Sequence, residues 1–336
     1  MDPTPIITVS ESVDWEIPSC IICGEQEKLT VLFSELQDRL CGLQGKFRLV
    51  RCERCTLVFM SPRPNVARIG DYYPNDYIAF QPTQQTNRHF VMRFTQGFKG
   101  SILRLLSTPY RVRFGPEGPA ELPFGRGRIL DVGCGTGLLL QEFQKIGWEV
   151  YGVDPSESAA RQARELLHSS NIYRGTLDDI TFPRDFFEIV TMWHSLEHVH
   201  DPRRVLMTIN QILTETGKLK IAVPNIESWE AKLLNKWWRG LEPPRHLYLF
   251  SPKTLTSLLE SSGFQVARLR PQLFPSSVTD SIDYFIENLF HVEWRRPKQK
   301  LTLYLFYFPV VLSYLVGNVG CIEVDATKIA GGQLSK

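Results

Sequence analysis

The hydrophobic pattern divides the second half of the chain into short strands and amphipathic helices. Short apolar runs, typical of buried strands, alternate with segments whose apolar residues recur every three or four positions. The expected strands are 128–132, 149–153, a short one near 172, 186–193 and 218–223, and the expected helices begin after Gly137 and cover 156–168 and 202–213. This β-α-β-α order predicts a parallel sheet with helices on both faces.

The end of the chain adds further elements to this pattern. A helix is expected at 252–262, because Ser251 is a suitable N-cap and Gly263 a suitable C-cap. Strands are expected at 264–269 and 321–326. The apolar run 301–316 contains Pro309 and is shorter than the roughly 20 apolar residues that a spanning helix needs.

The first part of the chain has a different character, with paired cysteines and short apolar alternations. From 87 to 114, bases alternate with apolar residues and no acid occurs, and 115–123 (GPEGPAELP) has the composition of a linker. We therefore expect three parts: a small module at 1–80, a helical connector and linker at 81–122, and an α/β domain at 123–336.

Composition restricts the class of protein. With 336 residues and 43% hydrophobic content the chain can bury a sizeable core, and its net charge of +2 gives no global argument for a nucleic-acid partner. The first residues, MDPTPIITVSESVDWEIP, lack the basic start and apolar core of a secretory signal. We therefore expect a cytoplasmic protein, whose seven cysteines are thiols or metal ligands.

The stretch DVGCGTG, from Asp131 to Gly137, follows the first strand of the α/β domain. It does not fit the dinucleotide fingerprint GxGxxG, since leucine occupies 138 and 140. Glycines allow a ligand close to the backbone, and the N–H groups of the next helix can bind a carboxylate. Asp154, at the end of the next strand, is placed to accept hydrogen bonds from ribose hydroxyls. Alternatively, this is a tight turn without a ligand, in which Asp154 caps the next helix.

These motifs resemble those of class I S-adenosylmethionine-dependent methyltransferases, which have a Rossmann-like sheet. The resemblance covers roughly 127–266 and also includes YRGTLDDI and FFEIVTMWHSLEHVHDP, in the positions of the third strand's end and the fourth strand with its loop. Many members have an acid where this chain has Thr176. The resemblance implies S-adenosylmethionine as cofactor, bound by Asp131, Gly133, Cys134, Gly135, Gly137, Asp154, Pro155, Thr176, Leu177, Asp178 and Trp193.

Two cysteine pairs, Cys20-x-x-Cys23 and Cys52-x-x-Cys55, have the spacing of a four-thiolate zinc site. Disulfides are the alternative. Together with VFMSPRP and YYPNDY, the pairs resemble the N-terminal zinc ribbon of methyltransferases of sugar and surface-glycan pathways, including sugar C-methyltransferases. That resemblance implies a structural zinc. It also implies that Tyr72, Tyr73 and Tyr77 close over cofactor or substrate, although a packed aromatic hinge is an alternative.

Methyl transfer usually requires a base near neutral pKa, which favours histidine. The stretch PPRHLYLFS resembles the glutamate-histidine-x-x-tyrosine-phenylalanine-serine stretch of sugar C-methyltransferases, so His246 matches the base of that family. Arg245 replaces the glutamate and would suit an anionic substrate group. The alternative for His246 is a helix cap or a core position.

A second group of candidates follows the fourth strand of the domain. His194 and His198 are four residues apart, and Glu197-His198 resembles a pair in ubiquinone-pathway O-methyltransferases. They could supply a base, hold a divalent ion, or order the loop over the cofactor. Asn225, which follows the fifth strand, is a candidate for substrate contact.

Three functions remain open. The first is a methyltransferase that acts on a sugar, a nucleotide-sugar or a lipid-linked glycan. The second is an O-methyltransferase of a quinone-like or other small hydroxyl acceptor, and the third is a zinc-ribbon binding protein with a vestigial cofactor site. The ribbon lacks a basic, aromatic surface, so no nucleic-acid partner is expected. The segments 88–106 and 301–316 suggest peripheral membrane association; alternatively, the first is a connecting helix and the second packs on the sheet.

Overall fold

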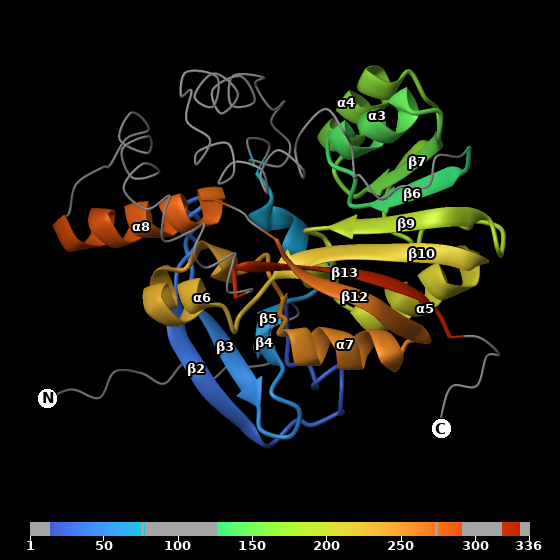
Figure 1. Ribbon diagram of the computed structural model, residues 1–336. Coiled ribbons are helices and arrows are strands. Elements are labelled where there is room, and N and C mark those ends of the chain that lie inside the picture. The colour runs from blue at the N-terminus through green and yellow to red at the C-terminus, as the bar shows by residue number, and fades with distance from the viewer. Residues whose placement is uncertain (1–13, 75–76, 78–125, 273–274, 291–317, 330–336) are drawn as a thin grey trace, which may run out of the picture.

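The computed structural model describes residues 14–74, 77, 126–272, 275–290 and 318–329 (Figure 1). The connector predicted at 81–122, with its basic segment 88–106, lies outside these residues, and so does the apolar run 301–316. None of the helices in the described part is both long and apolar enough to cross a membrane.

Seven strands form the central sheet, in the order β12-β13-β10-β9-β6-β7-β8. They are β6 (Arg128–Val132), β7 (Glu149–Asp154), β8 (Ile172–Arg174), β9 (Phe187–Trp193), β10 (Leu213–Pro224), β12 (Phe264–Gln272) and β13 (Cys321–Lys328). Neighbours from β10 to β8 pair in parallel, whereas β13 is antiparallel to both β10 and β12. The predicted Rossmann-like sheet is confirmed, and it is mixed at one edge because β13 runs in the opposite direction.

Four helices cover this sheet, as Figure 1 shows. They are α3 (Leu138–Lys145), α4 (Glu157–Leu167), α5 (Pro202–Ile212) and α7 (Pro252–Glu260). The crossovers β6-α3-β7 and β9-α5-β10 move along the sheet in opposite directions, so right-handed connections place α3 and α5 on opposite faces. Side chains of Ser156, Asp201 and Ser251 accept hydrogen bonds from backbone N–H groups and begin α4, α5 and α7.

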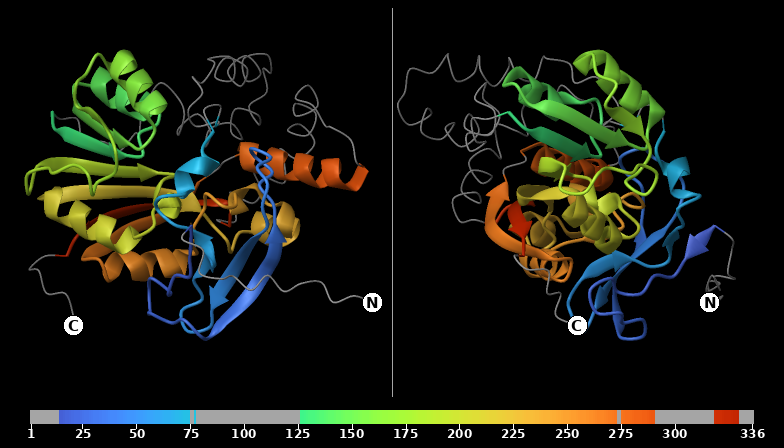
Figure 2. Two further views of the ribbon diagram at one scale, coloured as in Figure 1. Left: turned by 180° about the vertical axis from the view of Figure 1, so that it is seen from behind. Right: turned by 90° about the vertical axis from the view of Figure 1, so that its right-hand side faces the viewer.

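The N-terminal part forms a second sheet of four strands, in the order β11-β4-β3-β2. Its strands are β2 (Leu29–Leu36), β3 (Phe47–Cys52), β4 (Val58–Met60) and β11 (Tyr248–Leu249), and β1 (Trp15–Glu16) pairs with β5 (Arg63–Pro64) nearby. Strand β11 comes from the later part of the chain and pairs with β4. Figure 2 shows the N-terminal strands, in blue, beside the elements of the central sheet. One hydrophobic cluster contains side chains of both sheets, such as Phe59 and Val223. The two sheets therefore share a core.

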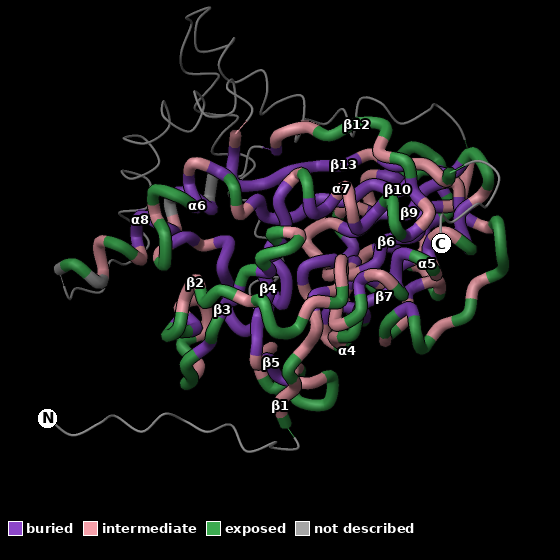
Figure 3. The backbone as a smooth tube through the Cα atoms, turned by 90° about the horizontal axis from the view of Figure 1, so that it is seen from below, coloured by how far each residue is buried: buried purple, intermediate pink, exposed green. Residues whose placement is uncertain are grey.

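Short helical elements connect the two sheets and surround the end of the central one. They are η1 (Ile69–Tyr72), η3 (Leu196–His198), α6 (Trp229–Leu234), η4 (Asn235–Trp237), η5 (Arg239–Leu241) and the longer α8 (Pro275–Phe290). The loop before β11 is buried. Figure 3 shows that most of β13 is buried, and the second half of β10 is buried as well.

Candidate active site

The parallel strands β6, β7, β9 and β10 all end at one edge of the central sheet, which is where ligands bind in open α/β sheets. Four predicted site residues lie at these ends. Asp131 is the residue before the last of β6, Asp154 ends β7, Trp193 ends β9 and Asn225 follows β10. The predicted base His246 lies in the loop before β11, and Leu247 donates its N–H to the carbonyl of Glu197 in η3. The structure thus brings the predicted histidines to this same edge.

The glycine loop between β6 and α3 has a backbone that other residues rarely adopt. Gly133, Gly135 and Gly137 have φ angles of +82°, +52° and +80°. A Cβ atom at Gly133 would lie 2.6 Å from Cβ of Ser195, and one at Gly137 would lie 3.0 Å from Cβ of Ala163. All three positions therefore favour glycine through their backbone conformation, and close packing also excludes a side chain at Gly133 and Gly137.

Two carboxylates flank this loop. Asp131 is buried and accepts a hydrogen bond of 2.7 Å from the hydroxyl of Thr191. Burial raises the pKa of Asp131 to about 7, although this hydrogen bond acts in the other direction. Asp154 accepts hydrogen bonds from the N–H groups of Gly135 at 2.8 Å and Ser156 at 2.9 Å, and burial raises its pKa. The Asp154 side chain thus orients the glycine loop, and Ser156, not Asp154, caps α4.

The remaining cofactor candidates have mixed surroundings. Leu177 is buried in the main core, and burial raises the pKa of the Cys134 thiol well above its usual range. Thr176 is exposed and donates its hydroxyl to Asp179, and Asp178 pairs with Arg204 at 3.0 Å. Pro155 is exposed and Trp193 is half-buried. These positions lie in the loops after β6, β7 and β8 and at the end of β9, and no contact in the structure assigns them a ligand.

Glu197 lies at the centre of the histidine group. Its side chain is fully buried, and its two carboxylate oxygens accept no hydrogen bond from any described residue. Nδ1 of His194 lies 3.5 Å and Nε2 of His246 lies 4.0 Å from Oε1 of Glu197. The ring of His198 meets that of His246 edge to face at 4.7 Å. The ligand atoms of Glu197, His198 and His246 lie within 4.8 Å of one another, a spacing compatible with either proton transfer or a metal ion.

The protonation of His246 follows from its surroundings. Nδ1 lies 2.8 Å from the carbonyl oxygen of Gly240, which can only accept, so Nδ1 carries the proton and Nε2 has a lone pair. Burial lowers the pKa of His246 to about 4, although Glu242 raises it. Burial and the neighbouring His246 also lower the pKa of His198 to about 4. Both imidazoles are therefore neutral at pH 7.

His194 differs from the other two histidines. Burial lowers the pKa of His194, but Cys321 and Glu197 raise it by a larger amount, so that the pKa lies at about 10. Nε2 of His194 lies 3.8 Å from Sγ of Cys321, at the start of β13. His194 is therefore protonated at pH 7, and its positive charge faces the Glu197 carboxylate.

Arg245 does not have the surroundings that the sequence predicts for a substrate contact. Its side chain is fully buried, and its guanidinium donates to both carboxylate oxygens of Asp38, at 2.9 and 2.5 Å, and to Glu242 at 3.1 Å. These acids raise the pKa of Arg245 against the effect of burial. Since all of these acceptors belong to the protein, Arg245 joins the N-terminal part to the His246 loop and is not available to a substrate anion.

Glu242, which is not among the residues predicted from the sequence, is central to the same group. Its carboxylate accepts hydrogen bonds from Arg239, from Arg245 and, at 2.7 Å, from the hydroxyl of Tyr77. Burial raises the pKa of Glu242, but Arg239 and His246 lower it well below its usual range. No local pattern in the sequence indicates this role, because Pro243 and Pro244 separate Glu242 from Arg245 and His246 and exclude a helical reading.

The tyrosine cluster is divided between two places. The hydroxyl of Tyr73 lies 2.9 Å from Nδ1 of His198, and the ring of Tyr77 meets that of Tyr73 edge to face at 5.2 Å. Tyr72 instead packs its ring against Phe47 in the core of the N-terminal sheet. Only Tyr73 and Tyr77 therefore contact the histidine group.

Asn225 is also engaged by the protein. Its side-chain amide donates to the carbonyl of Val319 at 3.3 Å, and its side-chain oxygen accepts from the N–H of Glu227 at 3.1 Å. With an exposure of 3%, it shapes the rim of the site and does not present its amide to a substrate.

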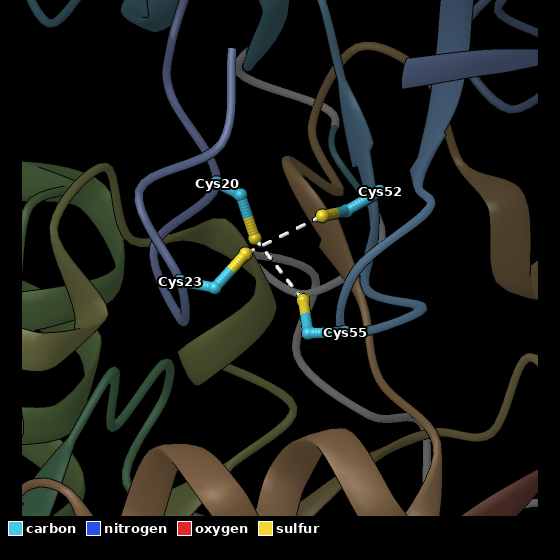
Figure 4. Close-up of side chains that lie close together, drawn as sticks. All are labelled: Cys20, Cys23, Cys52 and Cys55. Carbon is cyan, nitrogen blue, oxygen red and sulfur yellow. Dashed lines mark hydrogen bonds between the residues drawn. The ribbon is translucent and has the colours of Figure 1, made fainter. Parts of the chain in front are cut away.

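The four paired cysteines converge at one point of the N-terminal part (Figure 4). The sulfur atoms of Cys20 and Cys55 lie 3.3 Å apart, and those of Cys23 and Cys52 lie 3.4 Å apart. Both separations exceed a disulfide bond of about 2.05 Å. Four zinc–sulfur bonds of about 2.3 Å would require sulfurs slightly farther apart than this, so the donor set fits zinc after a small expansion.

Comparisons with known proteins agree with this arrangement. A family model described as "Methyltransferase domain" matches residues 102–269. Ubiquinone biosynthesis O-methyltransferases from Rhodopseudomonas palustris (strain TIE-1) and Bradyrhizobium sp. (strain ORS 278) are 34% and 37% identical to the chain over 107 residues, which are 31% of this chain and 42% of each relative. The match thus spans less than half the length of these relatives.

The chain is also similar to two solved structures. An S-adenosylmethionine-dependent methyltransferase from Mesorhizobium loti is 21% identical, with 63% of this chain and 98% of that chain covered and a TM-score of 0.43. A possible histamine N-methyltransferase from Thermotoga maritima is 20% identical, with 73% and 96% covered and a TM-score of 0.42.

Proposed function

Because this chain belongs to the methyltransferase-domain family, we propose that it methylates a sugar, nucleotide-sugar or lipid-linked glycan with His246 as base. It is an S-adenosylmethionine-dependent methyltransferase, and the proposal concerns its acceptor and its residues. The observation that carries the choice of base is the fixed tautomer of His246, whose Nδ1 proton is held by Gly240.

The glycine loop suits the methionine end of the cofactor. Glycines at 133 and 137 let the loop pack closely against Ser195 and Ala163. The N-terminus of α3, which follows the loop, offers N–H groups to a carboxylate. The Asp154 carboxylate accepts hydrogen bonds from two backbone N–H groups. A carboxylate can accept about four hydrogen bonds in total. Lone pairs therefore remain for the ribose hydroxyls. When bound, the cofactor supplies the methyl group on its sulfonium.

The protein's part in the reaction is to hold the acceptor and accept its proton. Neutral Nε2 of His246 takes the proton, and Glu197 at 4.0 Å and Glu242 at 3.7 Å stabilise the imidazolium that results. His198 adjoins this ring and is itself held by Tyr73, which keeps the group in position. The missing glutamate before His246 is thus replaced by carboxylates from other positions.

The sugar-type acceptor rests on the resemblance to zinc-ribbon methyltransferases. The four convergent thiols and the position of His246 beside the N-terminal part support it. We further propose that the thiols hold a structural zinc, which ties the loops around Cys20 and Cys52 together. Zinc would keep β3 and β4 in place, and through β11 also the loop of His246.

A small hydroxyl acceptor is the second candidate, and the match to ubiquinone biosynthesis O-methyltransferases favours it. Incubation with S-adenosylmethionine carrying a labelled methyl group separates the two. Label transferred to nucleotide-sugars or glycan lipids, and not to catechol-type phenols, supports the sugar acceptor, whereas the reverse result contradicts it. Because both products have the same mass, the ¹³C chemical shift of the labelled methyl group then distinguishes carbon from oxygen methylation.

A further inference from the structure

One side of the molecule carries large apolar side chains that the protein leaves exposed. Leu233 in α6 is 71% exposed, and Phe285 and Leu289 in α8 are 43% and 55% exposed. Trp237 of η4 lies between the two helices, with its ring 6.5 Å from that of Phe285. We call the surface formed by Leu233, Trp237, Phe285 and Leu289 the α6–α8 face.

The α6–α8 face continues a stripe that is buried elsewhere in the protein. Val278 and Ile282, in the first half of α8, are buried against Leu234 of α6. Phe285 and Leu289 follow at the spacing of the same helical stripe, but α8 extends beyond α6 there (Figures 1 and 3). The first half of this stripe is buried, and none of the described residues covers its second half. We therefore expect an apolar phase outside the protein to contact Phe285 and Leu289.

Bases gather around this apolar surface. The guanidinium of Arg39 lies 4.1 Å from the ring centre of Trp237 and donates to the carbonyl of Lys236. Nζ of Lys236 lies 5.1 Å from the same ring, and Lys232 is exposed one turn earlier. In the sequence, α8 is followed by Arg295, Arg296, Lys298 and Lys300.

The acids of α8 are partly engaged by the protein. Asp280 lies 3.8 Å from Arg239 and is half-buried, Asp283 is buried, and Glu287 is half-buried. An apolar surface with a tryptophan and a basic border is typical of proteins that lie on anionic lipid bilayers.

Side chains that contact the α6–α8 face and the His246 group line the same small cavity. Arg39, which lies over the ring of Trp237, and Glu242, which lies 3.7 Å from Nε2 of His246, both line this cavity. We propose that the α6–α8 face rests on an anionic membrane surface. This inference deepens the lipid-linked choice of acceptor, and its test does not depend on turnover.

Sedimentation with vesicles tests this proposal. The protein should sediment with vesicles of equal parts phosphatidylcholine and phosphatidylglycerol, and the double variant Phe285→Ser/Leu289→Ser should bind at least about tenfold more weakly. The control is Met207→Ser/Ile146→Ser, which removes side chains of matched exposure, 42% and 55%, from α5 and the end of α3. It should bind like the wild type.

Charge is tested with Lys232→Glu/Lys236→Glu, which should weaken binding about fivefold or more, with a smaller effect on vesicles of phosphatidylcholine alone. The proposal is overturned if the wild type does not sediment with either vesicle, or if the double serine variant binds as well as its control. It is also overturned if the α6–α8 face proves to join two copies, seen as a dimer in light scattering that only Phe285→Ser/Leu289→Ser abolishes. Thermal unfolding of each variant verifies that it is folded, and loss of methyl transfer alone would leave the binding result intact.

Discussion

The guanidinium of Arg245 donates to both carboxylate oxygens of Asp38, 207 residues earlier in the chain. Both side chains are fully buried. The same guanidinium also holds Glu242, which lies 3.7 Å from Nε2 of His246. This pair therefore connects the N-terminal sheet with the position of the proposed base.

Replacement of Asp38 should destabilise the protein strongly. Asp38→Ala leaves a buried guanidinium without its main partner, and such a loss costs about 3–5 kcal/mol. Urea unfolding measures the change. Glu35→Ala, which removes an exposed pair with Lys46, is the control and should unfold like the wild type. Equal unfolding curves for the two variants would show that the Asp38–Arg245 pair does not stabilise the fold.

Alanine substitutions at two glycines should distinguish a loss of cofactor binding caused by a blocked site from one caused by backbone strain. Gly133 and Gly147 both have positive φ angles, +82° and +93°, so alanine strains both positions. Only at Gly133 does the new Cβ meet a neighbour, at 2.6 Å. We expect Gly133→Ala to weaken S-adenosylmethionine binding in calorimetric titration by at least about tenfold, or 1.4 kcal/mol. Gly147→Ala should bind normally, and a comparable loss in this control would attribute the effect to general strain.

The sequence predicts those parts of this protein whose signals are local. The bounds that the sequence predicts for strands β6 to β10 and their helices agree with the structure to within a few residues. Hydrophobic periodicity and capping residues such as Ser251 act over only one or two turns, so they can be recognised locally. The convergence of Cys20, Cys23, Cys52 and Cys55 was likewise expected, since two short-spaced pairs of thiols have few other uses.

Contacts between distant segments could not be predicted in this way. The pairing of Arg245 with Asp38 and of β11 with β4 depends on the packing of the two sheets, which no local pattern encodes. For this reason the sequence suggests a substrate anion as the partner of Arg245, whereas in the structure its guanidinium pairs with Asp38 and Glu242. The reversed direction of β13 was equally hidden, because side-chain alternation is the same in parallel and antiparallel strands.

The cysteine cluster should contain zinc when the protein is purified. We expect one zinc ion per chain by mass spectrometry of the metal, and its loss in Cys52→Ser together with a lower unfolding temperature. Cys41→Ser, at a cysteine outside the cluster, should retain the metal. Zinc retained in Cys52→Ser, or absent from the wild type, would contradict the proposed site.

Loss of the proposed base should affect turnover without affecting the cofactor. His246→Ala should reduce methyl transfer about 10²- to 10⁴-fold, because general base catalysis contributes that much. S-adenosylmethionine affinity should stay near the wild-type value, since His246 lies outside the glycine loop. His168→Ala, at the exposed end of α4, is the control. Unchanged turnover in His246→Ala would transfer the role to another residue, with His198 as the neighbour to examine.

Acid should destabilise the fold through the two buried neutral imidazoles. The pKa values of His198 and His246 are lowered from 6.5 to about 4, so the folded state binds fewer protons than the unfolded state between these values. Their contribution is therefore intact above pH 6.5 and is lost as the pH falls towards 4, with at most about 3 kcal/mol for each histidine. The free energy of unfolding of His246→Gln in urea should consequently fall less steeply across this window than that of the wild type. His168→Gln should keep the wild-type slope, and parallel curves for wild type and His246→Gln would mean that His246 has the same pKa in the folded and unfolded states.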